Sequence, residues 1–172
     1  MPERTTDFEI TAVQLNFELP LLELLLSVER QIARAPVEVA FVFDKDKELI
    51  VSRQGAVKLI RFADTELARM TDCILTHNHP SHGPLSREDV EFAHDYELRE
   101  LRAVAGRCVY RLLRPALGWN RLLLAEVWES EERKIIRQFR QDRNRRRAEH
   151  KMNSLVTTVV KRLYLTTIRE KI

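Results

Sequence analysis

The spacing of hydrophobic residues in the first third of the chain alternates between helical and extended patterns. Aliphatic side chains recur at intervals of three and four over residues 20–34, which predicts an amphipathic helix. Residues 8–17 are rich in β-branched and aromatic side chains and predict a short strand before that helix. Two apolar runs, over 37–43 and 48–53, flank a polar turn and predict a β-hairpin after it.

The middle of the chain continues this alternation of strands and helices. In order, the pattern predicts a third strand over 56–62, a short helix over 64–70 capped by Asp64, a strand over 73–76, a helix from Ser86 to about residue 102, and a strand over 103–114 interrupted at Gly106. Such an order of elements predicts an α/β fold, in which helices flank a mixed β-sheet.

The chain changes character after Gly118. Residues 120–151 are highly charged and contain neither glycine nor proline, so they predict one extended helix. Residues 154–172 predict a second helix, although their valine and threonine content leaves a strand open. We therefore expect two parts, an α/β domain over 1–117 and a basic helical C-terminal extension over 118–172.

Charge is distributed unevenly between these parts. The formal charge of the chain is +3, but residues 131–172 contain thirteen Lys/Arg against five Asp/Glu, which gives +8 there and leaves −5 for residues 1–130. A basic helix can contact nucleic-acid phosphates. The candidate residues are Arg137, Arg140, Arg143, Arg145, Arg146 and Arg147. Interleaved acidic residues fit an ordinary solvated helix equally well. Ile135, Ile136 and Phe139 indicate that one face packs on something, and oligomerisation through these helices is one expectation.

Cysteine usage and hydropathy restrict the environment of the protein. Cys73 and Cys108 are far apart in sequence and lie in apolar stretches, so they predict neither a disulfide framework nor a thiolate metal site. The most apolar run, over 19–28, is too short to span a bilayer and contains Glu23. The N-terminus is polar and mixed in charge, unlike a secretory signal. We expect a cytoplasmic protein with no membrane partner.

Residues 76–89 carry the candidate chemistry. In an extended segment, residues two apart point to the same side, so His77 and His79 can offer two imidazoles to one ion. Two prolines and a glycine then turn the chain, and Asp89 in the next helix can fold back as a third ligand. Two nitrogens and one carboxylate leave a tetrahedral zinc ion one open position, as in catalytic zinc sites. The alternative is a pair of solvated loop histidines near a helix cap.

Neighbouring polar residues are expected to be neither metal ligands nor catalytic residues. His82 is expected to face outward from the turn, Glu88 to point away from Asp89 around the helix, and His94 to lie on the helix surface. Ordinary ion pairs on a helix face are expected for Glu97, Arg99, Glu100 and Arg102.

The segment resembles a known signature. A His-x-His followed by Ser-x-x-Asp is the pattern of the JAMM (JAB/MPN) metalloproteases, and the letters THNHPS, then SRED, are especially similar to RadC-like proteins and to JAB domains of phage-related proteins. The resemblance covers roughly residues 20–115 and is specific over 76–89. The family places seven residues between the second histidine and the serine, whereas this chain has six.

The resemblance implies a function and further site residues. It implies a JAMM-like fold and a zinc-dependent peptidase or isopeptidase, which hydrolyses an amide bond of a protein or peptide with a metal-activated water. Ubiquitin-like conjugates or precursors are one implied substrate class. Glu38, which follows Pro36 after the first predicted helix, takes the place of the family's general acid/base, with Glu48 as the second candidate. Ser86 takes the place of the residue that stabilises the oxyanion.

The sequence is compatible with two other functions. A RadC-like or phage-associated module would act on or near nucleic acid through the basic extension. A non-catalytic scaffold would keep only the JAMM shape, although such a scaffold has no reason to retain Glu38, Ser86 and all three metal ligands.

Overall fold

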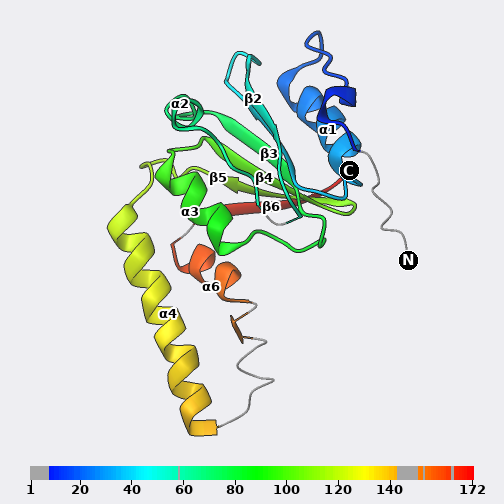
Figure 1. The fold of residues 1–172 in the computed structure, drawn as a ribbon. Coiled ribbons are helices and arrows are strands. Elements are labelled where there is room, and N and C mark those ends of the chain that lie inside the picture. Colours follow the sequence, from blue (N-terminus) through cyan, green and yellow to red (C-terminus); the bar gives the residue numbers. More distant parts are fainter. Residues whose placement is uncertain (1–7, 58, 143–150, 153, 164) are drawn as a thin grey trace, which may run out of the picture.

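The computed structural model describes residues 8–57, 59–142, 151–152, 154–163 and 165–172. They form a mixed α/β fold around one six-stranded sheet (Figure 1). The strands are β1 (Val39–Phe43), β2 (Leu49–Gln54), β3 (Ile74–Asn78), β4 (Glu100–Ala105), β5 (Cys108–Leu113) and β6 (Thr166–Lys171). The helices are the 3₁₀ turn η1 (Ile10–Ala12), α1 (Leu21–Ile32), α2 (Asp64–Leu67), α3 (Arg87–Asp95), α4 (Arg121–Asp142) and α6 (Leu155–Arg162).

The sheet has the strand order β2-β1-β3-β4-β5-β6. Only β3 and β4 run parallel, and α3 lies in the crossover that a parallel pair requires. All other neighbours are antiparallel. Gly106, with φ of 62°, begins the two-residue turn that joins β4 to β5. The predicted first helix, the following hairpin and the interruption at Gly106 are therefore confirmed.

Successive strand residues point to opposite sides of the sheet, and helices cover both of these faces. On one face, α1 packs its apolar stripe, which includes Leu24 and Val28, against Phe41 and Phe43 of β1. On the other face, Val42, Leu75, Leu101 and Leu112 pack with residues of α3, α4 and α6. Each buried aliphatic side chain contributes about 1.5–3 kcal/mol to folding. His77 lies on this second face of β3, as does Leu75, so this is the face that carries the candidate site.

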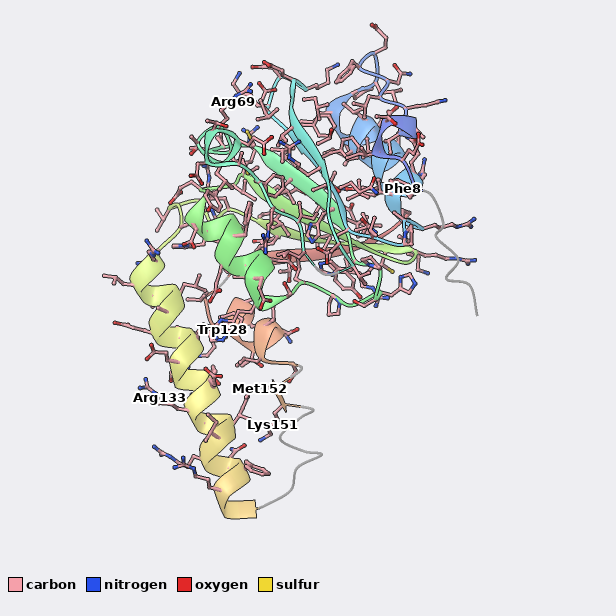
Figure 2. The ribbon with its side chains drawn as sticks, in the orientation of Figure 1. Phe8, Arg69, Trp128, Arg133, Lys151 and Met152 are labelled. Carbon is pink, nitrogen blue, oxygen red and sulfur yellow. The ribbon has the colours of Figure 1, made fainter. Side chains whose placement is uncertain are left out.

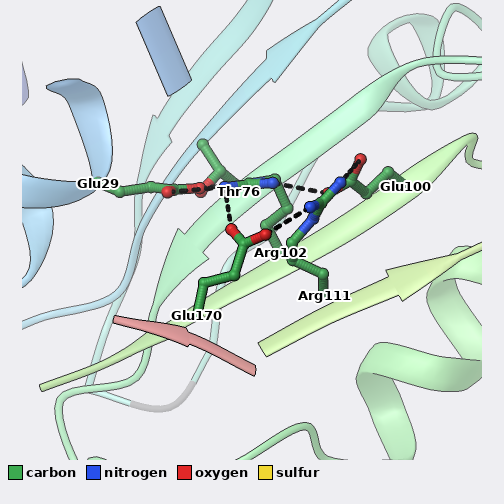
Figure 3. Close-up of polar contacts among 6 residues, drawn as sticks. All are labelled: Glu29, Thr76, Glu100, Arg102, Arg111 and Glu170. Atoms are coloured by element: carbon green, nitrogen blue, oxygen red, sulfur yellow. Dashed lines mark hydrogen bonds and ion pairs between the residues drawn. The ribbon is translucent and has the colours of Figure 1, made fainter. Parts of the chain in front are cut away.

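The α1 face contains a buried ionic network (Figure 3). The guanidinium of Arg102 is fully buried and donates to both carboxylate oxygens of Glu29, at 2.5 and 3.0 Å. A third donor of Arg102 reaches Glu100 at 2.7 Å. The hydroxyl of Thr76 on β3 donates to the same Glu29 carboxylate, at 3.0 Å. The network thus joins α1 to β3 and β4 directly behind the strand that carries the histidines.

The same network continues toward the edge of the sheet. Arg111 on β5 donates to Glu100 at 2.6 Å and to Glu170 on β6 at 2.6 Å. Both arginines are therefore shared between carboxylates that come from distant parts of the sequence (Figure 3). Buried arginines need hydrogen-bond acceptors for their donors, and Glu29, Glu100 and the partly exposed Glu170 supply them.

Several expected elements in the first half of the chain differ from the structure. The described residues of 8–17 contain the 3₁₀ turn but no strand. Among the described residues of 56–62, the only pairing is an isolated bridge between Ala56 and Leu59, because the chain turns back on itself after Gly55. The cap position of α2 is Ala63 rather than Asp64.

The helix predicted from Ser86 to about residue 102 ends at Asp95. Glu97 adopts a positive φ of 51°, which stops the helix, and residues 100–105 pair with β3 as strand β4. The predicted helix-face ion pairs are wrong for Glu100 and Arg102, which belong to the buried network. The prediction for His94 is also wrong, since its side chain is buried, with Nδ1 3.0 Å from Asp95 Oδ1.

The C-terminal part is helical only in part. The 22-residue helix α4 ends at Asp142 in the described chain, and residues 143–150 lie outside the described residues. The last helix, α6, has 8 residues and ends at Arg162. Residues 166–171 form β6, which pairs with β5 along its whole length, so the strand left open by the sequence is present. No helix in the described ranges is long and apolar enough to cross a membrane.

We refer to α4 and α6 together as the helical arm, which projects from the body of the molecule (Figure 1). Trp128 lies on the side of α4 that faces the body and is buried, whereas Arg133 points outward (Figure 2). The guanidinium of Arg87, at the start of α3, lies over the Trp128 ring at 4.7 Å from its centroid. The arm therefore contacts the helix that carries Asp89.

Candidate metal centre

Strand β3 places His77 and Asn78 on opposite faces of the sheet. On the far face, the Asn78 amide donates to the carbonyls of Ala35 and Val37, at 3.2 and 3.0 Å. Its oxygen accepts from the backbone N–H of Val39 at 2.7 Å. These bonds hold the segment that contains Glu38. Asn78 is therefore a positioning residue, which the sequence analysis did not identify. Its place between two histidines of one strand does indicate that its side chain points to the opposite face of the sheet.

His79 follows β3 but remains attached to the sheet. Its backbone N–H donates to the carbonyl of Val104 at 2.8 Å. Its ring Nδ1 lies 3.0 Å from the carbonyl of Gly83 in the following turn, and an N–H there donates to that oxygen. The hydrogen bond fixes the tautomer and leaves Nε2 as the nitrogen available to a ligand. The turn between His79 and Gly83 therefore orients the imidazole.

Asp89 is held by the start of α3. Ser86 is the N-cap, and its hydroxyl oxygen accepts from the backbone N–H of Asp89 at 3.0 Å. In return, the Asp89 carboxylate accepts from the Ser86 backbone N–H at 2.6 Å. This reciprocal capping box fixes both side chains at the N-terminus of the helix. The predicted start of this helix at Ser86 is confirmed.

The three candidate ligands converge. His77 Nε2 lies 2.8 Å from His79 Nε2 and 3.1 Å from Asp89 Oδ1, and His79 Nε2 lies 3.3 Å from Asp89 Oδ2. One ligand atom from each residue lies within 4.8 Å of the others, so this group could hold a metal ion. The alternative of separate solvated histidines does not hold, because both imidazoles point at one carboxylate and His77 is buried.

The electrostatics of the cluster reflect this proximity. Burial favours the neutral form of Asp89, but the adjacent His77 and His79 hold the pKa of its carboxyl well below the usual range. Burial opposes the charge on His79 too, yet the hydrogen bond to Asp89 raises its pKa to about 9. Burial raises the pKa of Glu38, although His77 and His79 act in the opposite direction. The negative charge of the Asp89 carboxylate thus favours a positive charge between the three side chains.

The donor set fits zinc. Two imidazole nitrogens and one carboxylate oxygen are ligands that zinc accepts, and three protein ligands leave the fourth position of a tetrahedron open. His77 Nδ1 is buried and has no hydrogen-bond partner among the described residues. Contacts of the other ring nitrogen, Nε2, with Asp89 or with an ion therefore decide which nitrogen of His77 carries the proton.

A cavity of about 490 Å³ opens onto the cluster. All five residues singled out from the sequence line it, namely Glu38, His77, His79, Ser86 and Asp89. Glu88, the residue before Asp89 on α3, also lines the cavity. Glu48, the second candidate for the glutamate, is exposed and pairs instead with Arg69 at 3.6 Å. His82 is exposed, as expected.

The candidate nucleic-acid residues are described only in part. Arg140 is exposed near the end of α4, whereas Arg143, Arg145, Arg146 and Arg147 lie outside the described residues. Ile135 is buried, while Ile136 and Phe139 are about two-fifths exposed. Nucleic-acid binding and oligomerisation through this helix therefore stay predictions.

Comparison of the chain with protein-family models, curated proteins and solved structures finds no match.

Loss of the cap at Ser86 should affect both the helix and the ligand. We expect Ser86→Ala to lower the free energy of unfolding by about 1 kcal/mol, because the Asp89 N–H loses its acceptor. Metal affinity should fall more modestly, because alanine keeps the backbone N–H that holds the Asp89 carboxylate and only the first turn of the helix is loosened. Urea unfolding and zinc titration measure the two effects, with Ser81→Ala on the neighbouring turn as the control. Equal affinity in the two variants would contradict a role for the cap in holding Asp89.

Proposed function

We propose that the protein is a zinc-dependent peptidase or isopeptidase of JAMM type, which hydrolyses an amide bond. The observation that carries the proposal is the convergence of two imidazoles and one carboxylate on the wall of a cavity that Glu38 and Ser86 also line. The His-x-His and Ser-x-x-Asp resemblance supports the JAMM assignment. The order of a helix, a hairpin, the histidine strand and the aspartate helix is consistent with it. By resemblance, ubiquitin-like conjugates or precursors are one substrate class.

His77, His79 and Asp89 would hold the zinc ion. When bound, zinc supplies a Lewis acid that polarises the substrate carbonyl and lowers the pKa of water. The protein fixes the ligands from three directions: β3 holds His77, the Gly83 carbonyl orients His79, and the Ser86 cap orients Asp89. These constraints preorganise the site, which reduces the cost of binding the ion.

Glu38 would act as general acid and base. Its carboxylate accepts a proton from the attacking water and delivers it to the nitrogen of the leaving amine. Two features suit it to this role. Backbone hydrogen bonds to Gly55 and Ala56 fix its position, and burial raises its pKa toward the range in which a carboxyl group can exchange protons.

Ser86 would stabilise the negative charge that develops on the substrate carbonyl oxygen. Its hydroxyl oxygen already accepts a hydrogen bond from the Asp89 N–H, so its hydrogen remains free to donate. A donor held in place before the reaction stabilises an oxyanion without reorganisation.

Exchange of Glu38 for glutamine tests the proposed chemistry. We expect Glu38→Gln to bind zinc as the wild type does and to lose turnover by about 10²–10⁴-fold, because glutamine cannot carry the proton. Zinc content is measured by elemental analysis. Turnover is measured on a peptide library by mass spectrometry of newly formed amino termini. Glu48→Gln, an exposed carboxylate outside the cavity lining, is the matched control. Turnover that survives in Glu38→Gln would assign the proton transfer to another group.

A second candidate function rests on the helical arm. Arg133, Arg137 and Arg140 are exposed on α4, so the arm could contact phosphates of a nucleic acid. Binding of a short DNA or RNA duplex should then weaken steeply with salt and should be lost when these three arginines are replaced by glutamine. Binding that does not depend on salt concentration, or an absence of binding, would remove this candidate.

The third candidate, a scaffold without activity, predicts a zinc-loaded protein that cleaves no peptide in the library.

A further inference from the structure

The cavity has a polar end and an apolar end. The polar end contains the metal cluster, Glu38 and Ser86. The remaining lining is largely apolar, and it includes side chains from three strands, from α3 and from the segment that follows β2.

The floor of the apolar end continues directly from His77. Leu75 lies two residues before His77 on β3, so the two side chains point to the same face. Leu101 on β4 is the direct neighbour of Leu75 across the parallel pair. Only 4% of Leu75 and 1% of Leu101 is exposed, yet both line the cavity. The cavity therefore reaches down to the core beside the first metal ligand.

The wall of the apolar end continues from Asp89. Phe92 lies three residues after Asp89, close to one turn of α3, so both side chains share one face of the helix. The Phe62 ring packs against the Phe92 ring, with centroids 5.7 Å apart. Both phenylalanines are half-buried and line the cavity. On β3 and on α3 alike, an apolar side chain that lines the cavity is thus the neighbour of a candidate metal ligand on the same face.

We infer that this apolar end is a subsite for an aliphatic or aromatic side chain of the substrate, beside the bond that is cleaved. The inference rests on the proposed function and specifies its substrate class. The carboxylates of Glu38 and Asp89 account for proton transfer and for the ion. Among the described residues that line the cavity, Glu88 is the one further carboxylate, whereas Leu75, Leu101, Phe62 and Phe92 are all apolar. A substrate with glycine or a polar residue at this position would leave the apolar surface wet. A leucine-sized side chain that fills this end would remove that surface from water and so bind more tightly.

Amino-acid hydroxamates test the subsite, because the hydroxamate group binds zinc and the side chain then extends into the cavity. The probes are the hydroxamates of N-acetylglycine, N-acetylserine and N-acetylleucine, titrated by calorimetry into the zinc-loaded full chain. We expect the leucine probe to bind about 10- to 100-fold more tightly than the glycine probe. The serine probe should bind about as the glycine probe does.

Variants locate the preference. Phe62→Ala should reduce the leucine-to-glycine ratio several-fold while the affinity for the glycine probe stays constant. Phe139→Ala, an exposed phenylalanine on α4, is the control that should leave the ratio unchanged. If Phe62→Ala does not fold, methyl resonances of Leu75 and Leu101 replace it. They should shift when the leucine probe, but not the glycine probe, is added to the wild type.

The outcomes separate the subsite from the proposed function. Equal affinities for the three hydroxamates would overturn the subsite and leave the zinc site standing. A leucine preference that Phe62→Ala does not reduce would overturn this location for it. A chain that retains no zinc and binds none of the probes would overturn both proposals.

Discussion

The His77→Ala/His79→Ala protein should purify without zinc, whereas the wild type should hold one zinc ion per chain. The double exchange removes both imidazoles of the cluster and leaves Asp89 as a single carboxylate ligand. Because zinc binding draws on every ligand of the site, we expect the affinity to fall by at least ~10³-fold. Elemental analysis after dialysis, and competition with a chromogenic chelator, give the content and the affinity.

The neighbouring histidine supplies the control for this experiment. His82 lies in the turn between His79 and Ser86, and it is exposed and outside the cluster. His82→Ala should bind zinc as the wild type does. A wild-type protein purified without chelators that contains no metal, and takes up none on titration, would refute the zinc site.

Arg102→Ala should be among the most destabilising single substitutions in the described chain. Among the residues that the structure describes, Arg102 is the only buried cation that both Glu29 and Glu100 contact, and its removal leaves Glu29 with no charged partner there. Loss of one partner from a buried ion pair costs about 3–5 kcal/mol, because the remaining charge is not solvated. Urea unfolding followed by circular dichroism measures this loss as a lower midpoint at unchanged slope.

Arg99→Ala provides the matched comparison. Arg99 lies immediately before β4, about half exposed, and its nearest carboxylate is that of Asp72 at 3.8 Å. An exposed pair of this kind contributes about 0–1 kcal/mol. Similar midpoints for Arg99→Ala and Arg102→Ala would show that the buried network adds nothing to stability. Restoration by the double exchange Glu29→Gln/Arg102→Met would identify the unpaired charge as the cause of the loss.

Those parts of the fold that depend on local patterns could be predicted from the sequence. The helix α1 and the hairpin of β1 and β2 follow from apolar spacing, and the start of α3 follows from the Ser86 cap. The group of candidate metal ligands was predictable for the same reason, since all three of its residues lie within 77–89. Glu38 came from the resemblance alone, and its place on the cavity wall depends on Asn78.

Long-range contacts explain what the sequence analysis missed. The charges of Glu100 and Arg102 are typical of a helix surface. These residues lie in a strand with their charges paired because Glu29, Arg111 and Glu170, distant in sequence, contact them or each other. The apolar end of the cavity has a similar origin. Phe62 and Phe92 belong to separate elements, and nothing in their local sequence indicates that their rings meet.

The position of the helical arm has a consequence for how the chain can be divided. The arm is an insertion between two strands that are direct neighbours, since Leu113 at the end of β5 pairs with Thr166 at the start of β6. A chain interrupted within the arm would therefore keep its C-terminal fragment, held by the β5–β6 ladder and the bond from Arg111 to Glu170. The arm is thus a natural place to split the protein into two separately produced pieces that reassemble.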